Sequence, residues 1–132
     1  MKEIRVRTER RTQVVDVTRE VREAVADSGG AAVSVYVPHT TAGVTINEGA
    51  DPAVARDLEA ALERMVDDGW PWQHHEPPED NAAGHVRTSL MGPSVVVPLR
   101  EDGSLALGTW QSIFFCEFDG PRERSVYVTV LG

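Results

Sequence analysis

Histidine is the residue type best suited to chemistry in this sequence, and it occurs only four times in 132 residues. His39, the neighbouring pair His74 and His75, and His85 all lie in segments whose composition predicts loops or strand ends. Imidazole is the commonest nitrogen ligand of metal ions, and three imidazoles on one ion leave a position open for water or substrate. The histidines are therefore candidate ligands of an open, enzyme-like metal site.

Spacing alone does not establish such a site. His74 and His85 are eleven positions apart and match no short metal-binding motif such as two histidines on one turn of a helix. The alternative is that the four imidazoles are solvated or hydrogen-bonded loop side chains, since proline-rich loops collect polar residues. On the pattern alone, this alternative is the better supported one.

The segment that follows residue 112 carries further candidates. Glu117 interrupts an apolar run, so its carboxylate is either desolvated, held by a cation or metal, or placed at the strand's end in solvent. Cys116 has no activating base in view and is expected to behave as a small buried hydrophobe. Arg122 and Arg124 have forked donors that suit a phosphate or carboxylate, although exposed arginines more often form surface ion pairs. Asp119 is explained by turn chemistry.

Composition excludes several classes of protein. The net charge of -8 opposes binding to a phosphate backbone, so nucleic acid is not an expected partner. Lys2 is the only lysine, which removes Schiff-base and P-loop chemistry. The single cysteine forbids a disulfide within the chain, and no apolar stretch is long enough for a membrane span. We therefore expect a cytoplasmic protein, with residues 1–132 forming one domain.

The elements that must position these residues are strands with two helices between them. Alternating residues predict a hairpin of strands over 4–8 and 13–15, and helical spacing follows from Asp16 or Thr18 until Ser28. Strands are predicted over 31–38 and 43–48, with the His39 loop between them.

A second helix is predicted to begin at Asp51 and Pro52 and to carry an apolar stripe as far as Met65. Residues 69–84 read as a long loop that is functional or mobile. Further strands are predicted over four segments: 94–99, 105–107, 109–118 and 125–131. Regular alternation of strand and helix is absent, so the sequence predicts an α+β fold with antiparallel sheets.

Several motifs together closely resemble the YjbQ-like family, also called the secondary thiamine-phosphate synthase enzyme family. They keep the family's order and spacing along essentially the whole chain. The matching segments are residues 38–43, 45–48, 51–52, 80–81 with His85, 108–111 and 117–122. The resemblance implies an α+β fold of antiparallel, sandwich-like sheets, a homotrimer, and a pocket with histidines and a bound divalent metal, zinc being the most plausible ion.

The resemblance also assigns roles to particular residues. His39, His74 and His85 fall on the family's histidine positions and are the predicted metal ligands, with His75 as the alternative to His74. The residues implied to be catalytic are Glu48, Trp110, Gln111, Glu117 and Arg122.

The resemblance implies an enzyme that joins an aminopyrimidine diphosphate to a thiazole phosphate with release of pyrophosphate. The word "secondary" in the family's name indicates that this activity is a side reaction. The leading hypothesis is a metal-dependent enzyme of small phosphorylated molecules, whose metal polarises a phosphoryl oxygen or activates water. Two alternatives stay open: a metal-dependent hydrolase of a phosphorylated molecule, and a non-catalytic trimeric protein that binds a metal or metabolite.

Overall fold

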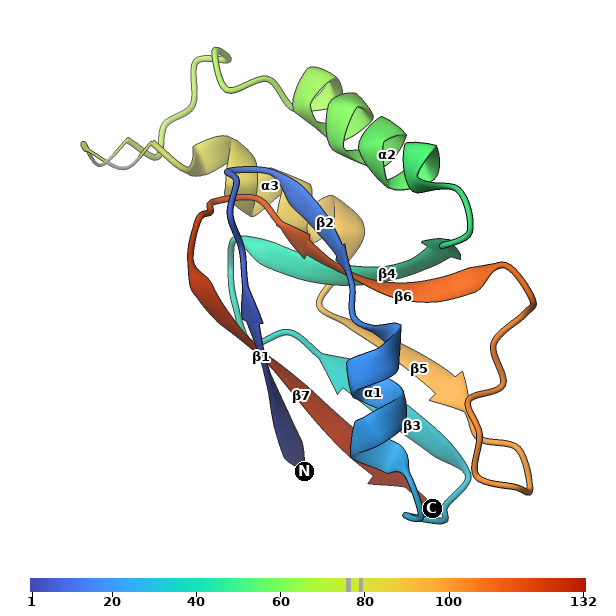
Figure 1. Ribbon diagram of the computed structural model, residues 1–132. Coiled ribbons are helices and arrows are strands. Elements are labelled where there is room, and N and C mark those ends of the chain that lie inside the picture. Colours follow the sequence, from blue (N-terminus) through green and yellow to red (C-terminus); the bar gives the residue numbers. More distant parts are fainter. Residues whose placement is uncertain (76, 79) are drawn as a thin grey trace.

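The protein is built from two antiparallel β-sheets and three helices, as the computed structural model shows for residues 1–75, 77–78 and 80–132 (Figure 1). One sheet has the order β1-β7-β3-β5 and the other the order β2-β6-β4. The strands are β1 (Lys2–Arg7), β2 (Gln13–Asp16), β3 (Ala32–Tyr36), β4 (Ala42–Glu48), β5 (Ser94–Pro98), β6 (Gln111–Glu117) and β7 (Glu123–Leu131). The helices are α1 (Thr18–Val25), α2 (Pro52–Met65) and α3 (Ala82–Met91). The predicted α+β class with antiparallel sheets is confirmed.

The main core lies between the two sheets. Val33 and Val35 of β3 point inward from the four-stranded sheet, and Ile113 and Phe115 of β6 point inward from the three-stranded sheet; all four are fully buried. Inward residues alternate with outward ones because side chains on a strand have a period of two. A second apolar cluster, around Leu62 and Phe114, joins α2 to the outer face of the three-stranded sheet.

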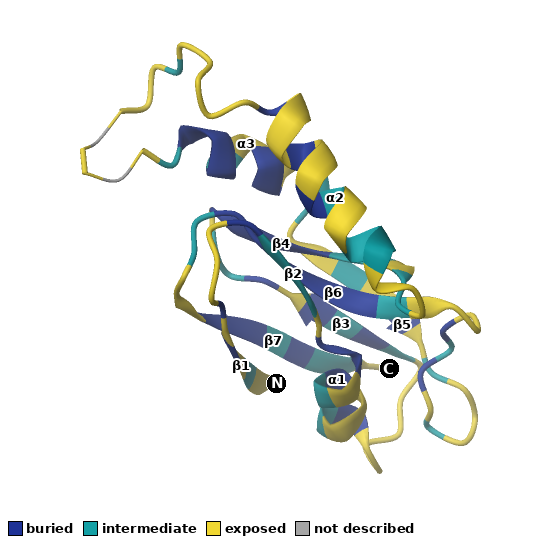
Figure 2. Cartoon of the chain, turned by 45° about the horizontal axis from the view of Figure 1, so that its top comes forward, coloured by how far each residue is buried: buried dark blue, intermediate teal, exposed yellow. Residues whose placement is uncertain are grey.

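At the starts of α2 and α1, a nearby aspartate accepts a hydrogen bond from a free backbone N–H group. The Asp51 carboxylate accepts a hydrogen bond from the backbone N–H of Ala53 at 2.9 Å, and Pro52 opens α2 as predicted. Asp16 accepts from the backbone N–H of Thr18 at 2.9 Å, just before α1. Figure 2 shows α2 with an exposed outer side and α3 with buried residues along it. No helix of the described residues is long and apolar enough to cross a membrane.

The predicted N-terminal hairpin is wrong. β1 pairs with β7, whereas β2 pairs with β6, so the two strands belong to different sheets. Residues between them instead contact the turn before β7: the Thr8 N–H donates to the Arg122 carbonyl at 2.8 Å, and the Gly120 N–H donates to the Arg11 carbonyl at 3.1 Å. Strand periodicity predicts which face is buried but not which strand is the partner.

Two further expectations need correction. Residues 105–107 were predicted as a strand, but only an isolated bridge between Leu99 and Leu105 forms there. A third helix, α3, was missed, and it carries His85, which was expected in a loop or at a strand end. Gly84 interrupts the helical pattern of this segment, so the sequence does not predict the helix. A Cβ at Gly84 would lie 2.8 Å from the Phe118 carbonyl oxygen, so glycine permits the close approach of α3 to the sheet.

Candidate functional site

Three segments lie together at one end of the molecule: the loop after β3, the start of α3 and the turn between β6 and β7. The Phe118 N–H donates to the Thr41 carbonyl at 3.0 Å, which ties the turn to the loop. The Asn81 side chain donates to Asp119 Oδ2 at 3.0 Å, which ties the start of α3 to the same turn. We call this region the histidine end, because it brings together segments that carry His39 and His85.

Two predicted ligands, His74 and His85, lie side by side at the histidine end. Their ring centroids are 5.1 Å apart and the rings meet edge to face at 82°. Both line a hollow of about 340 Å³, together with Trp72, Gln73, Ala82 and Val86. Two adjacent imidazoles at a solvent-accessible hollow supply two nitrogen donors of the kind that zinc prefers, of the three protein ligands that a catalytic zinc site uses.

His39 is engaged differently. Its Nε2 accepts a hydrogen bond from the Ser125 N–H at 3.0 Å, which joins the loop after β3 to β7. Burial lowers the pKa of His39, the nearby Arg124 guanidinium lowers it further, and Glu117 acts in the opposite direction. The lone pair of Nε2 is occupied in this arrangement, so coordination through that nitrogen requires the hydrogen bond to break. Its role as a ligand stays a prediction.

His75, the alternative to His74, faces a carboxylate. Its Nδ1 lies 2.7 Å from Asp80 Oδ1, and both side chains are exposed. Within residues 1–75, 77–78 and 80–132, no three His, Cys, Asp or Glu side chains are grouped closely enough to hold a metal ion. Of the predicted ligands, the structure therefore brings His74 and His85 together.

Beneath the histidine end lies a buried ion pair that joins the two sheets. Glu117 of β6 is fully buried, and its Oε1 accepts from Arg124 Nε of β7 at 2.9 Å. Thr8 donates its hydroxyl to the same carboxylate at 2.8 Å, and Arg124 Nη2 donates to Thr41 Oγ1 at 2.8 Å. Every partner is itself held by its neighbours, so the network is rigid. Pairing with a cation was one of the alternatives that the sequence left open for Glu117, and the structure identifies Arg124 as that cation.

Arg122 is anchored at the rim of the histidine end. Its Nη2 lies 2.7 Å from Asp119 Oδ2, and its Nε donates to the Asp119 carbonyl at 2.8 Å. Sequence reasoning assigned Asp119 to the turn and gave Asn81 no role of its own. The only available signal was the polar pair Asp80-Asn81 directly before a helical segment, which suits a helix start.

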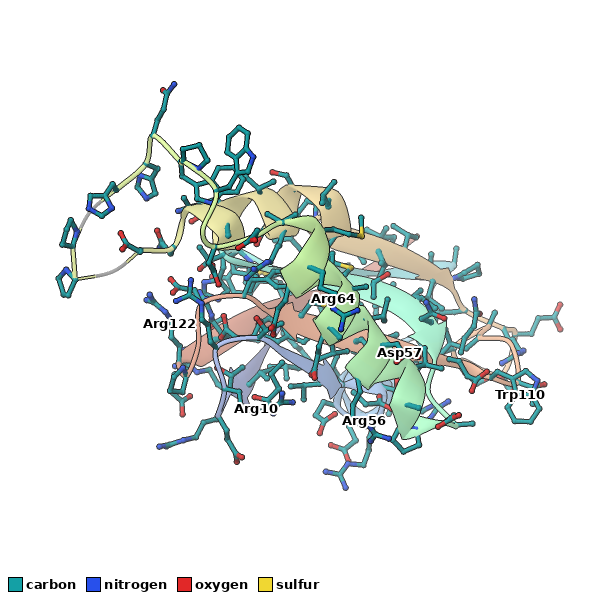
Figure 3. All side chains as sticks on the ribbon, turned by 90° about the horizontal axis from the view of Figure 1, so that it is seen from above. Arg10, Arg56, Asp57, Arg64, Trp110 and Arg122 are labelled. Carbon is teal, nitrogen blue, oxygen red and sulfur yellow. The ribbon has the colours of Figure 1, made fainter. Side chains whose placement is uncertain are left out.

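The other predicted catalytic residues lie at the opposite end of the β4–β6 ladder. Glu48 pairs with Gln111, whereas Ala42 pairs with Glu117, so the two ends are six residues apart, or about 20 Å along a strand. Trp110 is 65% exposed, and Figure 3 shows it on the opposite side of the molecule from Arg122. Gln111 Oε1 accepts a local hydrogen bond, from the Gly108 N–H at 2.9 Å. We call this region the tryptophan end.

The fold and the site thus define a two-sheet α+β protein with paired histidines at one end of its central ladder. A family model described as "UPF0047 protein YjbQ-like" matches residues 2–132. The chain belongs to this YjbQ-like family.

Two of the relatives match over at least 91% of their own length. The UPF0047 protein YugU of Bacillus subtilis is 44% identical and the match covers 100% of this chain and 99% of YugU. The UPF0047 protein MJ1081 of Methanocaldococcus jannaschii is also 44% identical, over 96% of this chain and 91% of its own. A crystal structure of a YjbQ/UPF0047 protein from Clostridium acetobutylicum superposes with a TM-score of 0.92 at 42% identity, covering 99% and 100% of the two chains. These likenesses define family and fold, and no reaction.

Proposed function

We propose that this protein is a metal-dependent enzyme that acts on a small phosphorylated molecule. The observation that carries the proposal is the pair of imidazoles, His74 and His85, on the wall of one hollow at the histidine end. Closed structural zinc sites usually use cysteine ligands, whereas histidine ligands around an accessible hollow are typical of catalytic sites. Cys116, the only cysteine, is fully buried in the second apolar cluster, and burial raises the pKa of its thiol to about 12.

The residues that would hold the ion are His74 and His85, with His39 as the predicted third ligand. When bound, a zinc ion supplies a Lewis acid for a phosphoryl oxygen or lowers the pKa of a water molecule. The chain's own contribution is to place the substrate. Trp72 gives the hollow an apolar wall.

The start of α3 and Arg122 support binding of a phosphate group. Among the residues that the structure describes, no side chain caps the first turn of α3, and that turn contains no acidic residue. Free N–H groups at a helix start bind anions well, and Ala82 of this turn lines the hollow. Arg122, whose Nε and Nη2 are held by Asp119, contributes positive charge at the same end. A substrate with a phosphate or diphosphate group suits this surface better than a neutral one.

We further propose thiamine-phosphate synthesis as a candidate reaction, with the carbon–nitrogen bond formed as pyrophosphate leaves. The support is the sequence resemblance together with the phosphate-binding features of the hollow. The competing reactions are hydrolysis of a phosphorylated molecule and binding without catalysis. The two substrates of the synthase, supplied together and separately, distinguish them: joining requires both, and hydrolysis requires only one.

Metal content tests the core of the proposal. Protein purified without a histidine tag, loaded with zinc and desalted, is analysed by elemental mass spectrometry together with His39→Ala, His74→Ala, His75→Ala and His85→Ala. Near-stoichiometric zinc in wild type and His75→Ala, with loss from His74→Ala and His85→Ala, supports the proposal. The His39→Ala result decides whether His39 is a ligand. If wild type holds no more zinc than the variants, the metal-dependent mechanism is wrong.

We also propose that the chain assembles as a homotrimer. The outer face of the four-stranded sheet exposes Tyr36, Val96 and Leu131, and the Tyr36 and Tyr127 rings stack with centroids 6.5 Å apart. The β5 edge, with the sequence SVVVP, lacks charge, whereas the β1 edge alternates charged residues. Uncharged edges are prone to association. Light scattering of wild type and of Val96→Glu tests this proposal: wild type is expected at three chains and the variant at one.

A further inference from the structure

We infer that Asn81 is a positioning residue that fixes which ring nitrogen of His74 carries the proton, leaving Nδ1 as the nitrogen available to a metal ion. That Nδ1 binds a metal ion depends on the proposed function. That Nε2 carries the proton is independent of the proposed function, because it follows from hydrogen bonds within the chain.

The chain of hydrogen bonds begins at Asp119. Its carboxylate can only accept, so the group of Asn81 that lies 3.0 Å from Asp119 Oδ2 is the amide NH₂. The amide oxygen of Asn81 then faces His74, with Oδ1 3.0 Å from Nε2. Because an amide oxygen cannot donate, Nε2 of His74 must carry the proton. In the neutral ring, the lone pair is therefore on Nδ1.

Asp119 is held firmly enough to impose this orientation. Its side chain is 12% exposed and pairs with Arg122 Nη2 at 2.7 Å. Its backbone N–H donates to Glu117 Oε2 at 3.0 Å, so Asp119 is anchored on the buried ion pair between the two sheets. The orientation of the exposed His74 ring is therefore fixed by hydrogen bonds that lead back to the buried Glu117–Arg124 ion pair.

Asn81 also positions the second imidazole. It directly precedes α3, and its carbonyl accepts the His85 N–H at 3.2 Å, which opens the helical hydrogen bonding. One residue thus orients the His74 ring through its side chain and locates His85 through its backbone. Partners that fix the tautomer of a histidine ligand commonly change metal affinity by about 10–100-fold when they are removed.

His39 has the opposite arrangement, which makes it an internal reference. Its Nε2 accepts from the Ser125 N–H, so the proton of the neutral ring is on Nδ1. Long-range proton–nitrogen NMR spectra of the metal-free protein distinguish the two tautomers, and His74→Gln and His39→Gln assign the two sets of signals. We expect the Nε2–H form for His74 and the Nδ1–H form for His39.

Asn81→Ala tests the positioning role, and Asn47→Ala is its matched control. The Asn47 side chain accepts a hydrogen bond from the Glu48 N–H at 2.8 Å, and Asn47 is an exposed residue of β4 near the tryptophan end. We expect Asn81→Ala to give His74 a mixture of both tautomers and to weaken zinc binding by about 10–100-fold, measured by competition with a chelator. Asn47→Ala is expected to change neither quantity.

The two readouts separate this inference from the proposed function. If wild type binds no zinc while Asn81→Ala still gives His74 a mixture of both tautomers, the positioning role of Asn81 is supported and the proposed metal site is wrong. If His74 is Nδ1–H in wild type, or keeps its Nε2–H form in Asn81→Ala, the inference is overturned. Asp119→Asn provides the same test should Asn81→Ala unfold, because an amide at 119 can pair with either orientation of Asn81.

Discussion

The two ends of the β4–β6 ladder differ in how their polar residues are held. At the histidine end, side chains from different segments hydrogen-bond to one another, from the buried Glu117 and Arg124 outward to Asn81 and His74. At the tryptophan end, the bonds of Gln111 and Asn47 are local, and Trp110 is 65% exposed. A preorganised site needs groups fixed before a ligand arrives, which only the histidine end provides within one chain.

The sharpest test of this contrast removes one partner of the buried ion pair. Arg124→Met leaves the Glu117 carboxylate buried without its cation, so we expect the free energy of unfolding to fall by about 3–5 kcal/mol. Urea unfolding followed by circular dichroism measures the change. Glu48→Ala, at the tryptophan end, is the control and is expected to stay within about 0.5 kcal/mol of wild type. Equal losses of unfolding free energy in Arg124→Met and Glu48→Ala would show that the two ends do not differ in how firmly their polar residues are held.

Glycine substitutions probe packing at the two ends. A Cβ at Gly120 would lie 2.3 Å from the Arg10 carbonyl oxygen, whereas one at Gly108 would meet no atom closer than Gln111 Oε1 at 3.4 Å. We expect Gly120→Ala to destabilise the protein by about 1–3 kcal/mol through overpacking, and Gly108→Ala to have little effect. Thermal unfolding compares the pair. A Gly120→Ala protein as stable as wild type would show that the turn adjusts freely.

The pH dependence of stability probes His39. Burial and the Arg124 charge lower its pKa in the folded protein below the ordinary value of 6.5, so the unfolded chain binds more protons as the solution becomes acidic. The stabilising contribution is therefore present above pH 6.5 and is lost as the pH falls through the lower, folded pKa. Unfolding of wild type and His39→Gln between neutral and mildly acidic pH measures it. We expect a shallower dependence in the variant, and identical slopes would contradict this explanation.

Trp110→Ala is expected to have the smallest effect on the stability of a single chain. The ring is 65% exposed, so its truncation should change the free energy of unfolding by no more than about 0.5 kcal/mol. Measurements at several protein concentrations extend the test. If the loss grows with concentration, Trp110 contacts a second copy, and the tryptophan end takes part in assembly.

Local signals predicted α2 well, because Asp51 and Pro52 mark its start and apolar residues recur along one face. α3 was missed because a glycine and a histidine interrupt its pattern and its close contact with Phe118 comes from distant sequence. The pairing of β1 with β7 could not be predicted from alternation, which specifies a face and not a neighbour.

The site was predictable to a similar degree. The histidines stood out by residue type, but the contact of His74 with His85 depends on how residues 69–75 fold back over α3. The Glu117 partner, Arg124, lies in the other sheet, so only the packing of the two sheets identifies it. The bond from Ser125 to His39 is likewise a contact between residues 86 positions apart.

The pairing of β1 with β7 and of β2 with β6 also has a consequence for biosynthesis. A ribosome releases the first two strands long before their partners, because Lys2 pairs with Val128 and Gln13 pairs with Glu117. The three-stranded sheet cannot be completed until β6 has been released, and the four-stranded sheet cannot be completed until β7 has been released. Proteins dominated by such distant pairings fold slowly, typically in milliseconds to seconds, and expose strand edges in the meantime. We therefore expect the charged residues of β1 to oppose association of the nascent chain as well as of the finished sheet edge.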